Sequence, residues 1–142
     1  MGNRNTPIRV LHPITRLIIG GAQENTLYTA ELLDPRRYQV EVVSGPQTGS
    51  EGSLIDEARR RKIALIILPD LLRQISPFHD LKALWKLTRM IRDGKFDIVH
   101  THSSKAGILG RIAAKLAGVP IIVHTVHGRS FHDYMSPLIR NM

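Results

Sequence analysis

The side chains best suited to chemistry lie in three short segments, each directly after a run of apolar residues. The first runs from His12 to Gly20-Gly21-Ala22 and includes Arg16. The second, His100-Thr101-His102-Ser103-Ser104-Lys105-Ala106-Gly107, concentrates hydrogen-bond donors, a cation and two imidazoles. The third, His124-Thr125-Val126-His127-Gly128, adds further imidazoles. Such groups are suited to binding an anionic ligand such as a phosphorylated substrate.

The diglycine Gly20-Gly21 opens an expected helix, so its amides could face a bound anion. Two glycines let the backbone approach a ligand closely, and free amides at a helix start favour negative charge. The segment is not a G-x-G-x-x-G fingerprint, and it is not a P-loop because no Lys-Ser or Lys-Thr pair follows the glycines. Two interpretations stay open from this segment alone: a phosphate cradle, or glycines that only make a tight turn.

Seven histidines with two close pairs also raise a metal interpretation. The pairs are His100-x-His102 and His124-x-x-His127, and together with His132-Asp133 they could supply ligands for zinc. However, His100 and His124 lie in strand-like segments with apolar flanking residues, so we expect them to be core or supporting groups bonded to backbone. The residues therefore favour a structural role for these histidines over a metal site.

Short apolar runs alternate with amphipathic segments along the whole chain. The runs are rich in β-branched residues, as strands buried on both faces usually are. This alternation predicts one α/β domain built on a doubly wound parallel sheet with right-handed crossovers. The expected strands are Ile8-Arg9-Val10-Leu11, Val40-Glu41-Val42-Val43, Ala64-Leu65-Ile66-Ile67-Leu68, Asp97-Ile98-Val99-His100 and Ile121-Ile122-Val123-His124.

The expected helices between these strands have recognisable ends. Asp34-Pro35 closes the first, because proline disfavours helical geometry in the residue before it. Ser53-Leu54-Ile55-Asp56 resembles a capping box that opens the second. Gly94 is a natural left-handed cap for the end of the third. The fourth opens near Ser103-Ser104 and stops at Gly118.

Two of these helices have a marked apolar pattern at helical spacing. In the third helix, the residues that share one face are Leu81, Leu84, Trp85, Thr88 and Ile91. In the fourth helix, small residues separate the larger apolar side chains, which are Ile108, Leu109, Ile112 and Leu116.

The usual strand order of a doubly wound sheet, 3-2-1-4-5, would bring the three polar segments together. In that order the first and fourth strands are neighbours and their helices leave on opposite faces, which creates a ligand-binding crevice. The loops that begin at His12 and His100 would border this crevice. The loop after His124 would add another imidazole beside them.

Composition limits the other possibilities. The 142 residues contain no cysteine, which excludes disulfides, thiolate metal sites and a cysteine nucleophile. No apolar stretch approaches the roughly 18 residues that a membrane span requires, and the polar start is not a signal peptide. We therefore expect a cytoplasmic protein.

The net charge of +8 suggests an anionic partner. The basic residues can be read as solvated helix surface or as a contact with acidic membrane at its inner face. Nucleic acid is not expected, because aromatic residues are only 5% of the chain and do not alternate with basic ones. The basic segments are Arg36-Arg37, Arg59-Arg60-Arg61-Lys62 and the series Lys82, Lys86, Arg89, Arg92 and Lys95.

Three segments, Arg16–Thr26, His100–Arg111 and His124–Gly128, together resemble the N-terminal domain of family 4 glycosyltransferases. The middle segment is the specific one, and the resemblance covers nearly the whole chain. Enzymes of this family have the two-domain GT-B architecture. The resemblance implies that residues 1–142 form one Rossmann-like N-terminal domain.

The resemblance also implies an activity: transfer of a sugar from a nucleotide-diphosphate donor to an acceptor, with retention of anomeric configuration. It implies that the reaction uses no metal and no cofactor, the nucleotide sugar being a co-substrate. By position, Gly20 and Gly21 would offer amides to the donor diphosphate. His102 matches the family's histidine that faces the donor sugar, and His127 matches another histidine of the cleft, so we take these two as catalytic. The other expected substrate-binding residues are Arg16, Ser103, Ser104 and Lys105.

Family members bind the nucleotide mainly through a C-terminal domain, which residues 1–142 do not include. We therefore expect the chain to be the acceptor-side fragment of a transferase, with little activity without its missing partner domain. The family suggests a role in bacterial cell-envelope polysaccharide or glycoconjugate synthesis, with a sugar or lipid-linked acceptor. Three alternatives stay open: a sugar-nucleotide epimerase of the same fold, a metal-dependent hydrolase, and a non-catalytic module that binds acidic membrane or a partner domain.

Overall fold

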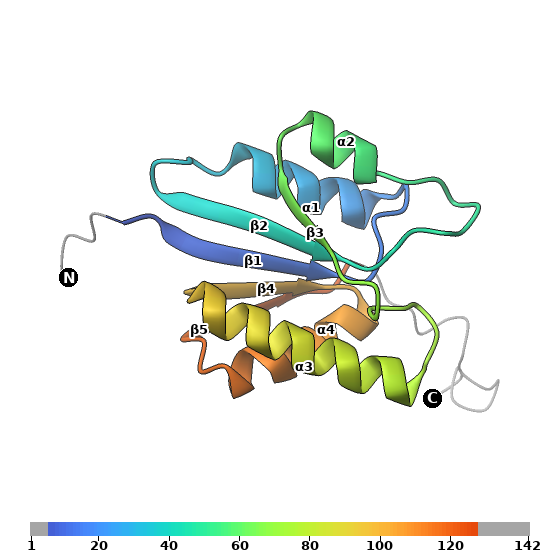
Figure 1. Ribbon diagram of the computed structural model, residues 1–142. Coiled ribbons are helices and arrows are strands. Elements are labelled where there is room, and N and C mark those ends of the chain that lie inside the picture. Colours follow the sequence, from blue (N-terminus) through green and yellow to red (C-terminus); the bar gives the residue numbers. More distant parts are fainter. Residues whose placement is uncertain (1–5, 128–142) are drawn as a thin grey trace, which may run out of the picture.

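Five strands rich in β-branched residues form one parallel sheet in the computed structural model, which describes residues 6–127 (Figure 1). The order across the sheet is β3-β2-β1-β4-β5, and every neighbouring pair is parallel. The predicted α/β class and the predicted 3-2-1-4-5 order are both confirmed. The strands are β1 (Ile8–Ile14), β2 (Tyr38–Ser44), β3 (Ala64–Ile67), β4 (Ile98–His102) and β5 (Ile121–Thr125).

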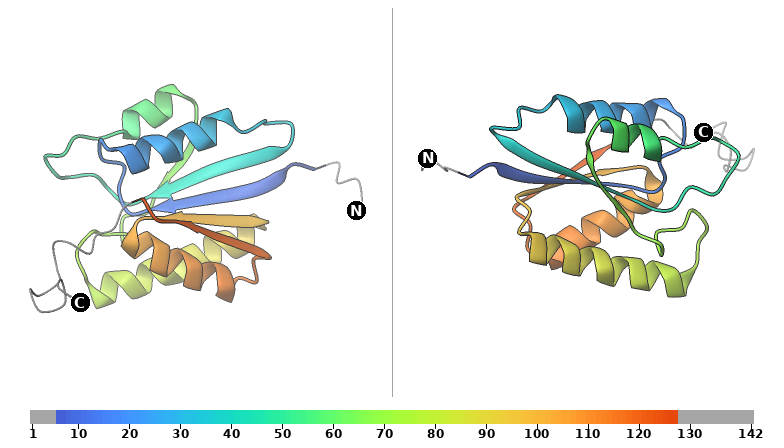
Figure 2. Two further views of the ribbon diagram at one scale, coloured as in Figure 1. Left: turned by 180° about the vertical axis from the view of Figure 1, so that it is seen from behind. Right: turned by 45° about the horizontal axis from the view of Figure 1, so that its top comes forward.

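Within residues 6–127, four helices cover the two faces of the sheet. Helices α1 (Gly21–Leu32) and α2 (Ile55–Arg60) lie on one face, and α3 (Pro77–Gly94) and α4 (Ser104–Leu116) lie on the other, as both views of Figure 2 show. The chain winds from β1 toward β3 and then returns to add β4 and β5. The direction of winding therefore reverses between β1 and β4, which is where a doubly wound sheet opens a crevice.

The central strands separate two buried cores. Leu11 of β1 and Val99 of β4 belong to the core shared with α3 and α4. Ile14 of β1 and Val42 of β2 belong to the other core, which α1 and α2 cover. Because successive side chains of a strand point to opposite faces, packing holds β1 from both sides. The loop that leaves β1 therefore starts from a fixed position.

The apolar face that the sequence indicates for α3 is only partly the face that packs. Leu81 and Trp85 are 68% and 59% exposed, whereas Ala83, Leu87 and Ile91 are buried. Both sets of residues recur at helical spacing, so periodicity alone does not distinguish them. Helix α3 packs against α4 as well as against the core, and the stripe that points between these neighbours is the one that is buried.

Helix α4 also turns its larger apolar residues outward. Ile108, Ile112 and Leu116 are exposed, and the buried residues are the small ones between them. A Cβ atom on Gly107 would lie 2.6 Å from Cε1 of His124, and one on Gly110 would lie 2.7 Å from Cγ2 of Thr101. The small residues therefore let α4 approach β4 and β5 closely.

Two predicted helix ends need correction. Helix α2 has Leu54 at its N-cap and no side-chain cap, because Ser53 Oγ accepts from the Ile55 amide at 3.2 Å, so the capping box does not form. The left-handed cap of α3 is Lys95, with φ of 50°, and Gly94 is the last helical residue.

The other helix ends agree with the sequence. Helix α1 stops before Asp34-Pro35, and α4 begins at Ser104 with Gly118, at φ of 76°, just beyond its end. Among residues 6–127, no helix has both the length and the apolar character needed to cross a membrane. The segment Ser136–Met142, which resembles a helix start in sequence, lies outside the described residues, as do His132 and Asp133.

Candidate functional site

The loops after β1 and β4 meet at the carboxyl edge of the sheet, as predicted, and direct hydrogen bonds join them. Ser103 Oγ accepts from the Thr15 amide at 3.1 Å and lies 2.7 Å from Thr15 Oγ1. Thr15 Oγ1 in turn accepts from the Ala106 amide at 3.1 Å. In Figure 1 the arrowheads of β1 and β4 lie at this edge together with the first turns of α1 and α4. The two loops that border the predicted crevice are therefore bonded to each other.

The diglycine lies at the start of α1, with Gly20 as the N-cap and no side chain capping the helix. Gly20 has φ of 176°, which is extended backbone open to any residue, so its conformation does not require glycine. A Cβ atom on Gly21 would meet nothing within 4 Å. The tight-turn interpretation therefore gains no support from the backbone, and the space above Gly21 is open to a ligand.

A hollow of about 300 Å³ lies between the first turns of α1 and α4. It brings together four residues that the sequence assigns to substrate binding, from loops that are far apart in the chain. It also includes Arg73, from the loop between β3 and α3, which no motif in the sequence indicates. The lining residues are Thr15, Arg16, Ile18, Gln23, Arg73, Ser103, Ser104 and Lys105.

A second hollow of about 320 Å³ lies beside the first, and Arg16 and Arg73 line both. Its other side is formed by the loop after β2, which includes Glu51. Glu51 Oε1 lies 3.3 Å from Nη1 of Arg16 and 3.6 Å from Nη1 of Arg73. A hydrogen bond from its own amide, together with that from Arg16, lowers the pKa of Glu51. One carboxylate thus pairs with two guanidinium groups at the carboxyl edge of the sheet.

The remaining predicted binding residues differ in how free they are. The Lys105 ammonium contacts the Gln74 carbonyl and the Asp80 carboxylate, so it ties α4 to the start of α3. Ser103 Oγ donates to the His102 carbonyl at 2.5 Å, and its backbone has a left-handed φ of 62°. Ser104 is exposed. Ser103 therefore holds the site together, while Ser104 is open to solvent.

A row of three histidines runs from the core to the surface. His12 Nδ1 lies 2.8 Å from Nε2 of His102, and Nδ1 of His102 lies 2.9 Å from Nε2 of His127. His12 and His102 are buried, whereas His127 is exposed. The two predicted catalytic histidines are therefore in direct contact. His12, which the sequence analysis names only as the start of a loop, supports them from below.

Burial keeps the imidazoles of His12 and His102 neutral. It lowers the pKa of His12 to about 3, with a further contribution from His100. Burial also lowers the pKa of His102 to about 2, and the neighbouring His12 and His100 add to the effect. Because removing a cation from water without an acidic partner is costly, the neutral form is the stable one.

Neutrality determines which nitrogen bears each proton. His12 Nε2 is buried without a hydrogen-bond partner, and a buried N–H without an acceptor costs more than an unused lone pair. His12 therefore bears its proton on Nδ1 and donates to His102 Nε2. His102 must then bear its proton on Nδ1 and donate to His127. Both hydrogen bonds of the row therefore point outward, from the core to the cleft.

The other two histidines of these strands have side-chain partners. His100 Nε2 lies 2.6 Å from Thr125 Oγ1, and His124 Nδ1 lies 2.9 Å from Thr101 Oγ1. They are supporting groups, as predicted, but their partners are threonine hydroxyls of the neighbouring strand and not backbone. Their positions on opposite faces follow from strand pairing, since His100 is paired with Val123 and Thr101 with His124.

The histidines that come close enough to share a metal ion differ from the set that the sequence suggested. One potential ligand atom from each of His12, His100 and His102 lies within 4.8 Å of the others. In the observed arrangement, however, His12 and His102 use nitrogens 2.8 Å apart to bond each other. Zinc–imidazole distances of about 2.0–2.1 Å would require both rings to turn away from that bond. The expectation that the protein uses no metal therefore stays a prediction.

Two charged residues of this edge, Arg73 and Asp70, lack any motif in the sequence. Both lie in the loop after β3, and loops after parallel strands are where ligands are bound. Asp70 is buried and accepts from Lys86 at 2.5 Å and from His79 at 2.9 Å, which together lower its pKa. These bonds fix the loop that presents Arg73. Strand position was the only signal that could have indicated them.

Comparison with known proteins gives consistent matches. A family model described as glycosyl transferase 4-like domain matches residues 20–142. The chain is 40% identical over 136 residues to the UDP-Gal:alpha-D-GlcNAc-diphosphoundecaprenol alpha-1,3-galactosyltransferase of Escherichia coli, which covers 94% of this chain and 33% of that protein. The chain therefore spans about a third of the length of this curated relative.

Solved structures share the fold. A glycosyltransferase from Rickettsia africae superposes with a TM-score of 0.69 at 23% identity, over 86% of this chain and 30% of that one. A UDP-N-acetylglucosamine 2-epimerase superposes with a TM-score of 0.59 at 18% identity, over 96% of this chain and 39% of that one. A transferase and an epimerase thus have this fold in common.

Proposed function

This chain belongs to the glycosyl transferase 4-like domain family, and on that basis we propose that it forms the acceptor-side domain of a retaining glycosyltransferase. The observation that carries the proposal is the convergence at one edge of the sheet of an uncapped helix start, a cationic hollow and a row of three histidines in contact. Because the chain spans a third of its curated relative, the complete activity is assigned to an enzyme that also has a donor-binding domain.

The proposed reaction moves a hexose from a nucleotide diphosphate to a lipid-linked sugar of the cell envelope. The E. coli relative is named for transfer from UDP-Gal to a diphosphoundecaprenol-linked GlcNAc, which supports this class of donor and acceptor. The fold alone would also allow an epimerase. The family match favours transfer, and an epimerase would convert the nucleotide sugar without any acceptor.

The site can favour the charges that develop as the donor bond breaks. Negative charge grows on the leaving diphosphate, and the free amides of Gly20 and Gly21 at the positive end of α1 would stabilise it. Because its pKa is low, His102 is a neutral hydrogen-bonding group near pH 7 and does not act as a general acid there. Both its nitrogens are occupied, so contact with the sugar requires that the exposed His127 move or make that contact itself.

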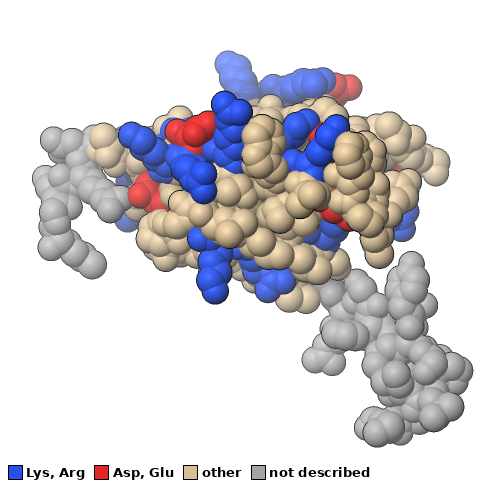
Figure 3. All heavy atoms as spheres, turned by 60° about the horizontal axis from the view of Figure 1, so that its bottom comes forward, with Lys and Arg blue, Asp and Glu red and all other residues tan. Residues whose placement is uncertain are grey.

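We also propose that the protein lies peripherally on an acidic membrane, where a lipid-linked acceptor would be found. Exposed apolar side chains just before α3 and along it, which include Ile75, Phe78 and Trp85, support this location. Lys82 lies 4.6 Å from the Phe78 ring centre and Arg89 lies 5.6 Å from that of Trp85. Figure 3 shows this side of the molecule, where basic groups surround broad areas without charge. Apolar side chains beside cations suit an anionic bilayer surface.

The function is tested with the natural gene product that contains this chain, labelled UDP-galactose and a GlcNAc-diphosphoprenol acceptor. We expect acceptor-dependent transfer that needs no added metal, and we expect Gly21→Ala to reduce it strongly because the new methyl group would occupy the open space at the phosphate. Leu32→Ala, at the exposed opposite end of α1, is the control. Conversion of the donor without acceptor would contradict the transferase assignment, and full activity of Gly21→Ala would contradict the diglycine assignment.

A further inference from the structure

Three loops at the carboxyl edge of the sheet contribute to one cluster of charges. Arg16 follows β1, Glu51 lies between β2 and α2, and Arg73 lies between β3 and α3. Glu51 Oε1 accepts from Nη1 and Nη2 of Arg16, both at 3.3 Å, and faces Nη1 of Arg73 at 3.6 Å. A single carboxylate oxygen thus faces three guanidinium nitrogens, and its bonds span loops 35 residues apart in the chain.

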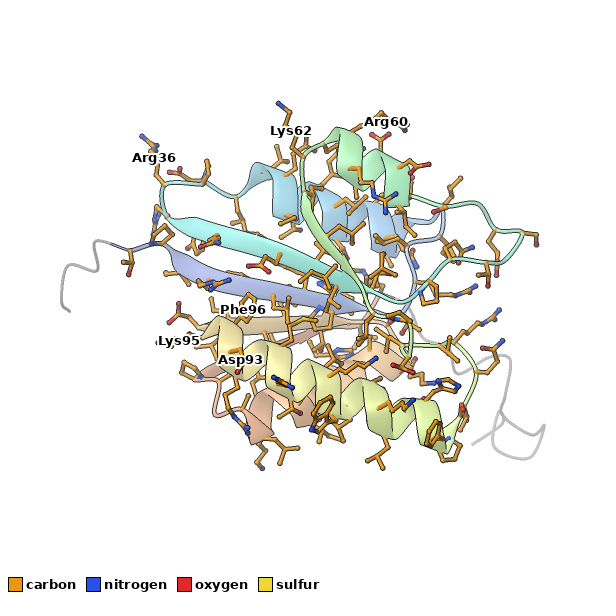
Figure 4. All side chains as sticks on the ribbon, in the orientation of Figure 1. Arg36, Arg60, Lys62, Asp93, Lys95 and Phe96 are labelled. Carbon is orange, nitrogen blue, oxygen red and sulfur yellow. The ribbon has the colours of Figure 1, made fainter. Side chains whose placement is uncertain are left out.

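This cluster differs from the short-range arginine pairs on the surface of residues 6–127. Arg36 bonds its near neighbour Asp34, and Arg60 bonds Glu57 one helical turn away, both on the exposed surface. Figure 4 shows Arg36 and Arg60 projecting outward from the molecular surface. Arg16, in contrast, has a side chain only 15% exposed and lines the two adjoining hollows together with Arg73. Its guanidinium is therefore held in place at the site and is not free to move as a surface charge is.

We propose that Arg16 and Arg73 bind the diphosphate of the acceptor, and that Glu51 occupies these arginines when the acceptor is absent. The inference rests on the proposed function and names the acceptor-binding residues of the same site. Guanidinium groups match phosphate oxygens in geometry and form strong charge-assisted bonds with them. A diphosphate offers more charge and more oxygens than one carboxylate, so it can displace Glu51.

Glu51 is placed to leave without cost to the fold. Its side chain is 38% exposed, so the carboxylate can move into water and stay hydrated. Glycines flank it: a Cβ atom on Gly49 would lie 2.1 Å from Glu51 Oε2, and Gly52 has a left-handed φ of 76°. The glycines thus let this loop fold back on the arginines, and the carboxylate can be exchanged for a ligand.

The neighbouring surface favours the acceptor over the donor as the source of the diphosphate. The donor diphosphate already has a proposed place at the uncapped start of α1, and neither Gly20 nor Gly21 lines the hollows that the arginines share. Arg73 is followed closely by Ile75 and Phe78, which are 90% and 67% exposed. A prenyl chain that leaves the arginines would meet these apolar side chains. An amphiphile with an anionic head is therefore the ligand that fits.

The test measures binding of two diphosphates, geranyl diphosphate and UDP, by calorimetry, to the natural gene product that contains this chain and to its variants. Arg73→Gln should weaken geranyl diphosphate binding about tenfold, as expected for one lost charge-assisted bond. Glu51→Gln should tighten it about three- to tenfold, because the competing carboxylate is removed. UDP binding should change little in either variant. Arg36→Gln, which removes an equally charged but remote side chain, is the matched control and should change neither.

Two results would overturn the inference: unchanged or weaker geranyl diphosphate binding in Glu51→Gln, or equal losses of UDP and geranyl diphosphate binding in Arg73→Gln. Both substituted side chains are at least partly exposed, so the variants should fold, which circular dichroism can verify. In the complete enzyme, Arg73→Gln should raise KM for the lipid-linked acceptor and leave KM for the nucleotide sugar unchanged. The binding pattern stands or fails without any transfer activity, so its failure is distinguishable from failure of the proposed function.

Discussion

Acid should destabilise this protein through two buried histidines, His12 and His102. In the folded protein, burial holds the pKa of His12 at about 3 and that of His102 at about 2. In the unfolded chain both imidazoles have a pKa near 6.5. Below pH 6.5 the unfolded chain therefore binds protons on these two imidazoles, and the folded chain does not. Stability is fully present above pH 6.5 and is lost as the pH falls toward the folded values.

The size of the effect follows from the width of that window. Each proton that only the unfolded chain binds lowers the free energy of unfolding by about 1.4 kcal/mol per pH unit. A fall from pH 7.5 to pH 5 therefore lowers it by roughly 2 kcal/mol for each histidine and about 4 kcal/mol for the two. A small domain has only about 5–15 kcal/mol in total. The loss at pH 5 should therefore be a large share of the free energy of unfolding.

Urea unfolding followed by far-ultraviolet circular dichroism, repeated between pH 7.5 and pH 5, measures this loss directly. The variant His12→Asn keeps a donor near the position of Nδ1 and removes one of the two imidazoles, so it should retain about half of the pH dependence, roughly 2 kcal/mol. Imidazole NMR signals give a second readout, since those of His12 and His102 should show no protonation at pH 5.

The reasoning would be refuted by either of two results. A free energy of unfolding that changes by less than about 1 kcal/mol between pH 7.5 and pH 5 would mean that the folded state accepts the protons. An undiminished pH dependence in His12→Asn would mean that other groups cause it.

Three further predictions concern α3 and α4. Leu87→Ala should lower the free energy of unfolding by about 2–5 kcal/mol because Leu87 is fully buried, whereas Trp85→Ala should change it little. Comparable losses of stability in thermal melts would mean that Trp85 packs in the interior, as the sequence indicates. Trp85→Ala should instead reduce co-sedimentation with phosphatidylglycerol vesicles at low salt, and unchanged sedimentation would argue against α3 as the membrane contact. Gly107→Ala should cost about 1–3 kcal/mol, because its Cβ would lie 2.6 Å from the His124 ring, while exposed Lys115→Ala should be nearly neutral by the same melts.

Patterns that are local in the chain were sufficient to predict the architecture. The alternation of β-branched runs with helix-like segments indicated all five strands and their order, because a parallel sheet leaves few ways to connect such elements. The same order placed the segments after β1 and β4 at one edge. The convergence of Arg16, Ser103, Ser104 and Lys105 on one hollow could therefore be expected from sequence.

The errors share a physical cause. Leu81 and Trp85 have the spacing of a buried stripe, but the contact with α4 decides which stripe of α3 is inside. The expected capping box depends on the exact path of the chain before α2. The Leu54 amide donates to the remote Leu17 carbonyl at 2.8 Å, and on this path Ser53 bonds a nearer amide. In each case a periodic or short-range signal was present, and a neighbour that is remote in sequence determined how it was used.

The sequence by itself determined the fold class, the strand order, the family and the loops that carry polar groups, because these depend on hydrophobic period and on residues close in the chain. Only the tertiary structure decided the contacts that give the site its chemistry. His12 and His102 are 90 residues apart and become neutral because packing removes both from water. Arg16, Glu51 and Arg73 meet because three loops end at one edge of the sheet. Protonation and ion pairing depend on distance and burial in space, which no spacing along the chain records.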